Sequence, residues 1–146
     1  MIGTDVLLVL HLLGAVVWVG GMFFALLVLR PALAVLEPAA RMALLVAVLR
    51  RFFGIIWIAM PLMLVTGFWM VFAAFGGFAD LPWNVDVMML LGLIMSGVFV
   101  WLVVGPWRTF RAAPSPATMD PVRRLVHANL GLGIITIVIA ALGQLG

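Results

Sequence analysis

The uncharged run from Val6 to Leu29 constrains most strongly what this chain can fold into. As an α-helix rising about 1.5 Å per residue it is roughly 36 Å long, enough to cross the ~30 Å hydrocarbon core of a bilayer. Its only ionisable residue is His11. An ionisable side chain inside a membrane is costly unless it faces a partner or a cavity, so His11 is a candidate for function.

Composition extends this interpretation to the whole chain. Of its 146 residues, 67% are hydrophobic and 9% are charged, a balance typical of polytopic membrane proteins. We expect one all-α domain over residues 1–146, an antiparallel bundle of four transmembrane helices. The expected spans are 5–29, 52–77, 85–106 and 122–144. Because cysteine is absent, disulfides and thiolate ligands are excluded.

The positions of the basic residues predict an orientation. All eight are arginines, and they fall in the first and third connections: Arg30, Arg41, Arg50, Arg51, Arg108, Arg111, Arg123 and Arg124. By the positive-inside rule these connections are cytoplasmic. Both termini and the second connection, which carries Asp80 and Asp86, then face the periplasm or the exterior. We expect a multi-pass protein of a bacterial inner membrane, with the lipid bilayer and no nucleic acid as partner.

Prolines and capping residues predict where the helices begin and end. The expected helix starts are Thr4, Pro38, Val85 and Asp120–Pro121. The first helix is expected to end at Arg30–Pro31, and Pro61 is expected to kink the second. We expect Asn84 to cap the third helix and Arg108–Met119 to form a loop.

Trp18 lies on the same stripe of the first helix as His11. Tryptophan in membrane helices favours the interfaces, yet Trp18 falls near mid-span. We therefore expect this stripe to face inward, where small residues leave room for a bound group or for a neighbouring helix. His11 itself suits a ligand or a structural hydrogen bond equally well.

Counting residues along the helices places Met70 and Met89 in the same leaflet as His11. Imidazole and thioether groups together suit Cu(I), while one of each could hold a haem iron. The candidate metal ligands are therefore His11, Met70 and Met89, and Trp18 joins them as a candidate cofactor-binding residue. Methionine also fills apolar interiors, so packing is the alternative for Met70 and Met89.

His127 is expected to have a different role from His11. It lies near the cytoplasmic interface, where a histidine can be solvated, and its depth differs from that of His11 by ~20 Å. One iron cannot be bound by both in a monomer. The chain also lacks phosphate-loop, nucleophile-elbow and dinucleotide signatures, so nothing in it indicates an enzyme or a catalytic residue.

Three segments resemble the copper-resistance protein D (CopD) family. They are His11-Leu-Leu-Gly14 with Trp18-Val-Gly20-Gly21 and Arg30-Pro31, then Thr66-Gly67-Phe-Trp69, and finally Asn129-Leu-Gly131-Leu-Gly133-Ile-Ile-Thr136. The resemblance implies a four-helix bacterial inner-membrane unit associated with copper uptake or homeostasis, and it makes His11 the main metal-site candidate. Larger members of the family have additional helices.

A more distant resemblance is to the HemJ-type protoporphyrinogen oxidase, which also has a histidine and a tryptophan in its first helix and is linked to haem. This chain contains no lysine, so the basic residue expected near the start of the third helix in that family is missing, and Asp86 lies nearby instead. The oxidase activity therefore does not carry over.

The sequence leaves three functions open. The first is copper binding for transport or homeostasis, with copper as the ligand of His11. The second is a haem b-binding protein that transfers electrons to or from quinone or a periplasmic partner. The third is a structural or assembly subunit without a cofactor. A homodimer or a larger membrane complex could bring together ligands that one monomer separates.

Overall fold

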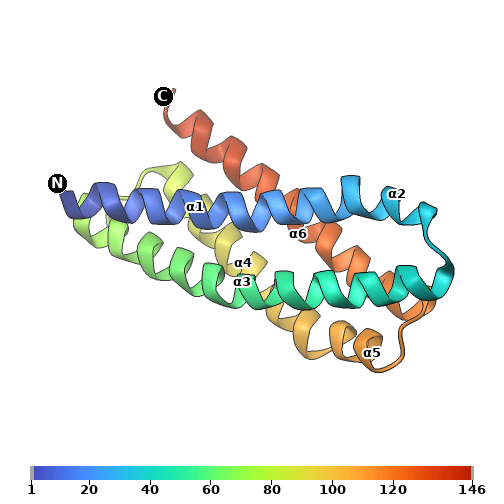
Figure 1. Cartoon of the computed structure of the whole chain (residues 1–146). Helices are drawn as coiled ribbons and strands as arrows, with labels where there is room; N and C mark the ends of the chain where they lie inside the picture. The colour runs from blue at the N-terminus through green and yellow to red at the C-terminus, as the bar shows by residue number, and fades with distance from the viewer. Residues whose placement is uncertain (1, 146) are drawn as a thin grey trace.

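A computed structural model of the protein describes residues 2–145. Four helical segments are long and apolar enough to cross a membrane, and they are Gly3–Val35, Pro38–Phe75, Trp83–Ala112 and Pro116–Gly143. The expected all-α, four-span architecture is confirmed. Figure 1 shows both chain ends at one end of the molecule, together with the connection between α3 and α4, while α2 and α5 lie at the opposite end.

The first segment continues beyond its predicted end. It comprises α1 (Ile2–Phe24), a π-helical turn (Ala25–Leu29), α2 (Arg30–Ala32) and a 3₁₀ turn (Leu33–Val35). Pro31 has no N–H group and its ring crowds the preceding turn of a regular helix. Here that turn is widened, because the Arg30 N–H donates to the Ala25 carbonyl five residues earlier. The wider turn accommodates Pro31, and the predicted stop at Arg30–Pro31 is wrong.

The second segment, α3, runs from Pro38 to Phe75 and contains Pro61. Its start agrees with the prediction. It ends slightly early because Gly76 adopts a left-handed conformation with φ of 74°, and its N–H donates to the Phe72 carbonyl. Glycine takes this conformation without steric cost, which makes it a common helix terminator.

The third and fourth segments also differ from the predicted boundaries. They comprise α4 (Trp83–Val104), α5 (Pro106–Ala112) and α6 (Pro116–Gly143). The predicted loop Arg108–Met119 is therefore mostly helical, because α5 and the start of α6 cover most of it. The helix α4 begins directly after Pro82, with no side-chain cap, so Asn84 does not cap it.

The start of α6 is set by a capping box that the prediction missed. The Ser115 hydroxyl accepts from the Thr118 N–H at 3.1 Å, and the Thr118 hydroxyl accepts from the Ser115 N–H at 3.0 Å. These two bonds satisfy free donors of the first turn, so the helix begins at Pro116 rather than at Asp120–Pro121. The Asp120 carboxylate instead forms ion pairs with Arg123 and Arg124.

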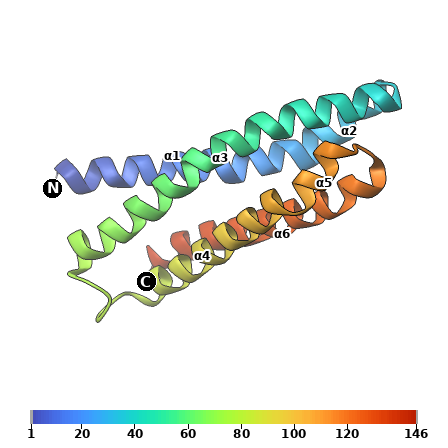
Figure 2. The ribbon, with the colours of Figure 1, turned by 90° about the horizontal axis from the view of Figure 1, so that it is seen from below.

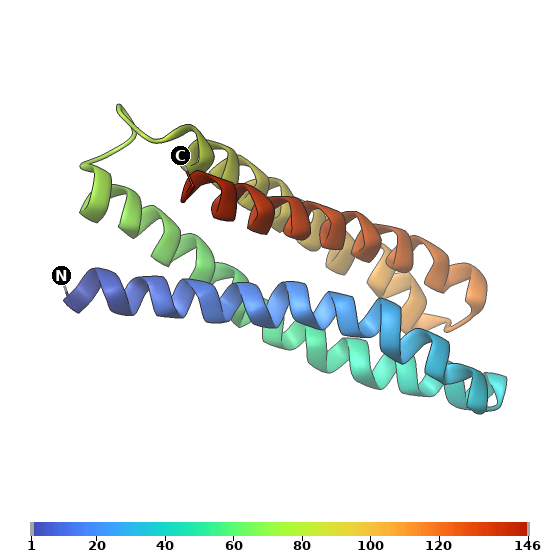
Figure 3. The same ribbon diagram turned by 90° about the horizontal axis from the view of Figure 1, so that it is seen from above.

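The bundle is built from two closely packed helix pairs, α1 with α3 and α4 with α6. Figures 2 and 3 show each pair side by side along most of its length. Aromatic rings join the pairs: Phe53 of α3 lies 5.9 Å from Phe99 of α4 and 5.1 Å from Trp107 of α5, between ring centroids. Both contacts lie in the half of the bundle that contains α5.

Glycines allow α1 to approach α3. A Cβ atom at Gly14 would lie 2.5 Å from Cγ of Met63, and one at Gly21 would overlap the Phe52 ring. Small residues at such positions drive close packing of membrane helices. Because large apolar side chains such as Val16 and Ile58 are exposed on the outer surface, the chain is a multi-pass membrane protein whose sides contact lipid.

Candidate functional site

His11 is fixed against α3 by its Nδ1 atom. This atom lies 3.0 Å from the Met63 carbonyl oxygen and 3.1 Å from Oγ1 of Thr66. Thr66 is itself 2% exposed, and its hydroxyl donates to the Leu62 carbonyl at 2.7 Å. The imidazole therefore makes contacts with two consecutive turns of α3, just after Pro61 in the chain.

These contacts determine which nitrogen of His11 carries the hydrogen. A carbonyl oxygen only accepts, and the Thr66 hydrogen is used toward Leu62, so Nδ1 must be the donor. The other nitrogen, Nε2, then keeps its lone pair, which is the form that binds metals. Nε2 makes no hydrogen bond to the described residues. His11 can therefore serve as a ligand through Nε2.

The neighbouring side chains leave little freedom for the imidazole. A Cβ atom at Gly67 would lie 3.2 Å from Cε1 of His11, so a larger residue there would displace the ring by a few tenths of an ångström. One turn further along α1, the Met63 side chain fills the space beside Gly14, with Sδ 3.2 Å from the position of a Cβ there. Met63 was not among the predicted ligands, and its proximity to His11 comes from the pairing of α1 with α3.

The two methionines predicted as ligands lie on different helices. Met70 is half-buried on α3, four residues after Thr66, and so lies on the face of α3 that contacts α1. Met89 is half-buried on α4. The described aromatic contacts between α3 and α4 are made by Phe53, Trp57 and Phe99, well away from Met89 in sequence. Met63 and Met70 therefore share the His11 face of α3, and Met89 as a ligand stays a prediction.

Trp18 lies in the core and apart from His11. It is 4% exposed, and its ring centroid is 6.2 Å from that of Phe99. Seven residues separate it from His11, or ~10 Å along the helix axis. With Met22 and Asn129 it lines a small internal void, which His11 does not line. The predicted inward-facing stripe of α1 therefore contributes His11 to the contact with α3 and Trp18 to the core of the bundle.

Asn129 is a buried polar residue that the sequence interpretation assigned to no site. It is 2% exposed, and its Nδ2 donates to the Met95 carbonyl at 3.0 Å. Its Oδ1 atom is buried and has no hydrogen-bond partner among the described residues. An amide in the middle of an apolar helix is the sequence signal that indicates such a site.

His127 occupies the exposed side of α6. Its Nδ1 lies 3.0 Å from the Arg123 carbonyl oxygen one turn earlier, and Arg123 pairs with Asp120. This is a local hydrogen bond within one helix, and no side chain of another helix takes part in it. His127 is therefore peripheral, and its contact with solvent stays a prediction.

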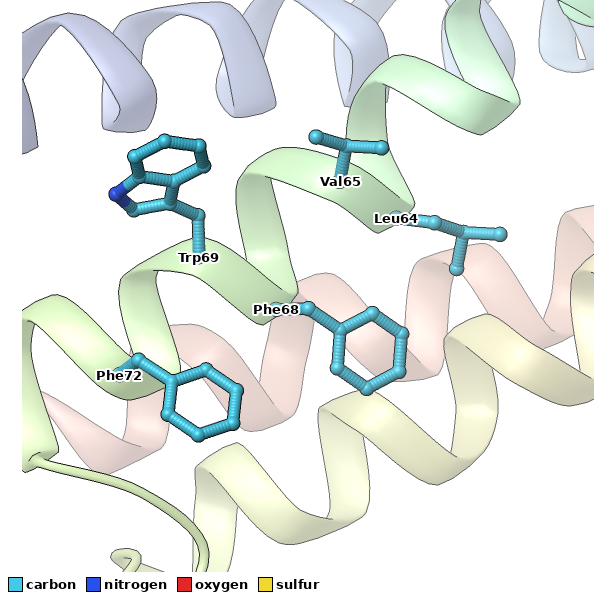
Figure 4. Close-up of a pocket in the computed structure, with 5 residues that line it drawn as sticks. All are labelled: Leu64, Val65, Phe68, Trp69 and Phe72. Atoms are coloured by element: carbon cyan, nitrogen blue, oxygen red, sulfur yellow. The ribbon is translucent and has the colours of Figure 1, made fainter.

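An apolar groove of about 410 Å³ lies along the C-terminal half of α3. Figure 4 shows the side chains that line it, Leu64, Val65, Phe68, Trp69 and Phe72. None is a ligand for a metal ion, and His11 does not line the groove. In residues 2–145 no group of three or more His, Cys, Asp or Glu side chains is placed to hold a metal.

Comparison with known families finds a match to this chain. The model of a family described as copper resistance protein D matches residues 46–142. This range contains Met63, Met70, Met89 and Asn129, whereas His11 precedes it. Searches of curated proteins and of solved structures give no match.

Proposed function

We propose that this chain, which belongs to the copper resistance protein D family, binds Cu(I) at His11 and takes part in copper transport or homeostasis. The observation that carries the proposal is the hydrogen bond from His11 Nδ1 to the Met63 carbonyl. It holds the imidazole in one orientation and leaves Nε2 as the ligand atom. Such backbone partners are typical of metal-binding histidines.

The donors near His11 match a soft, singly charged ion. Met63, whose carbonyl contacts His11, and Met70, one turn after Thr66, lie on the same face of α3, and each carries a thioether sulfur. Imidazole and thioether are neutral groups, and thioethers select Cu(I) among the available metals. Copper is the substrate of the protein, and His11 binds it transiently together with the thioether of Met63, of Met70 or of both.

We further propose that copper reaches His11 from the periplasmic side. The arginines of α2 and α5 lie at the end of the bundle opposite both chain ends, and the positive-inside rule assigns the arginine-rich end to the cytoplasm. His11 is nine residues from the start of α1, or ~14 Å along its axis. It would then lie in the outer half of the membrane, within reach of a periplasmic copper carrier.

The geometry favours copper over haem at His11. A haem needs a flat cavity beside its axial ligand. The groove of about 410 Å³ on α3 is not lined by His11, and the void near Trp18 is far smaller. A single ion needs no such cavity.

A transport assay tests this function. The purified protein is reconstituted in liposomes that contain a Cu(I)-responsive dye, and Cu(I) is added outside with a reductant. Wild type is expected to carry copper inward, His11→Ala to fall to the rate of empty liposomes, and His127→Ala to match wild type. Equal rates for wild type and empty liposomes would contradict copper transport. A reduced-minus-oxidised haem spectrum that depends on His11 would support the haem alternative instead.

A further inference from the structure

Arginines of two helices lie at the contact between α3 and α5. The ring centroids of Phe53 on α3 and Trp107 on α5 are 5.1 Å apart. Arg50 lies one turn before Phe53, and Arg111 lies one turn after Trp107. Figure 1 shows that α3 leads away from the end of the bundle that α5 approaches, so both steps go toward that end, by roughly 5 Å along each axis. The packing of the two rings therefore brings an arginine of each helix to the same end of one contact.

The arginines at this contact are exposed, and the described part of the chain does not compensate their charge. Among residues 2–145, Arg50, Arg108 and Arg111 form no ion pair and no side-chain hydrogen bond. At this end of the bundle the Asp120 carboxylate is already ion-paired within α6, and Glu37 precedes Arg50 by ~20 Å along α3. Positive charges that gather in this way attract an anion from outside the chain.

An apolar surface continues from Arg50 into the membrane. The uncharged stretch of α3 begins at Phe52, so Arg50 lies at the edge of the span. Trp57 lies two turns further along α3, ~10 Å deeper and only about 20° around the helix from Arg50. It is 43% exposed, and its ring centroid is 5.1 Å from that of Phe99 on α4. Guanidinium groups at the edge of the span and an exposed indole below them fit an amphipathic anion better than a soluble one.

We infer that the contact between α3 and α5 is a binding site for an anionic phospholipid of the adjoining leaflet. Arg50, Arg108 and Arg111 bind its phosphate, and its acyl chains lie against Trp57. Guanidinium groups form charge-assisted, often bidentate, hydrogen bonds with phosphate oxygens, and basic pockets between transmembrane helices bind acidic lipid headgroups. A soluble anion would contact the arginines alone and would leave the indole exposed. The site is independent of the proposed copper function.

Native mass spectrometry of the detergent-solubilised protein, titrated with phosphatidylglycerol, tests this inference. Wild type is expected to bind phosphatidylglycerol more tightly than phosphatidylethanolamine. Arg50→Gln and Arg111→Gln are each expected to weaken phosphatidylglycerol binding by about fivefold, the contribution of one arginine near an anionic lipid surface. Arg51→Gln is the matched control, because Arg51 is also exposed and removes the same charge, but it lies about 160° around α3 from Phe53. It should keep the wild-type affinity.

The outcomes distinguish a lipid site from general charge attraction and from a soluble-anion site. Equal weakening in Arg50→Gln and Arg51→Gln would show that overall charge attracts the lipid, and it would overturn the inference. Equal wild-type affinities for the two lipids would also overturn it. An excess of inorganic phosphate, compared with chloride at the same ionic strength, should leave phosphatidylglycerol bound. Displacement of the lipid by phosphate but not by chloride would mean that the arginines bind a soluble anion instead.

Discussion

Nδ1 of His11 lies 3.0 Å from the carbonyl oxygen of Met63, across the contact between α1 and α3. This hydrogen bond joins two helices, fixes the tautomer of the imidazole and leaves Nε2 free of hydrogen bonds to the described residues. One contact thus serves both the packing of the bundle and the proposed metal site, and suitable variants can separate the two roles.

The variant His11→Asn separates the role of His11 in helix packing from its proposed role in copper binding. His11→Ala removes the hydrogen bond to Met63, and interhelical hydrogen bonds in membranes average about 0.6 kcal/mol. His11→Asn places an amide N–H near the position of Nδ1 but has no counterpart of Nε2. We expect His11→Ala to lower the free energy of unfolding in mixed micelles by that amount and His11→Asn to lower it less, while both lose copper. Copper binding by His11→Asn at the wild-type level would show that Nε2 is not the ligand.

Gly67 is expected to control the position of the imidazole. A Cβ atom there would lie 3.2 Å from Cε1 of His11, so Gly67→Ala should push the ring and weaken Cu(I) binding by on the order of tenfold, as for other changes next to a metal ligand. Gly54→Ala is the control on the same helix, because a Cβ at Gly54 has no atom within 4 Å. Equal affinities for the two variants, measured by chelator competition, would count against the site.

Gly133 is expected to determine how closely α6 packs against the rest of the bundle. A Cβ atom there would lie 2.8 Å from Cγ2 of Val19 and 3.2 Å from Cε of Met95. Gly133→Ala should therefore destabilise the protein by about 1–3 kcal/mol through overpacking. Gly131→Ala, whose Cβ would have no atom within 4 Å, should leave the unfolding midpoint close to wild type. Indistinguishable midpoints would mean that α6 is not packed against α1 in this way.

The proposed orientation can be tested by labelling single cysteines, because the chain has none of its own. Asp86 and Ala113 are both exposed and lie in opposite end regions of the bundle. Asp86→Cys should react with a membrane-impermeant maleimide in intact spheroplasts, and Ala113→Cys only after the membrane is opened. The reverse pattern would invert the topology and place His11 in the cytoplasmic leaflet.

Hydropathy was sufficient to predict the four spans, but it did not fix all their ends. The helix passes Pro31 because the π turn at Ala25–Leu29 makes room for the proline ring, and a hydropathy pattern contains no signal for such a turn. Asp120 was expected to cap α6, yet the pair Ser115 and Thr118 satisfies two backbone donors at once. Where several capping residues follow one another, the reciprocal pair determines the start.

The sequence predicted how deep in the membrane the candidate site residues lie, but not which helices bring them side by side. Counting residues placed His11 and Met70 in one leaflet, and the pairing of α1 with α3 puts Met70 on the face that contacts His11. Hydropathy does not say which helices pair, so the approach of Met63 and the separation of Trp18 from His11 could not be derived. The unpaired Oδ1 of Asn129 is likewise a property of packing.

X-ray absorption of protein loaded with one equivalent of Cu(I) tests the central claim most directly, because it identifies the atoms bound to the metal. The account predicts imidazole nitrogen and thioether sulfur in the first shell of wild type, and loss of the imidazole contribution in His11→Asn. His127→Asn should give the wild-type spectrum. A spectrum of wild type without imidazole, or one that His11→Asn leaves unchanged, would contradict the assignment of His11 as the copper ligand.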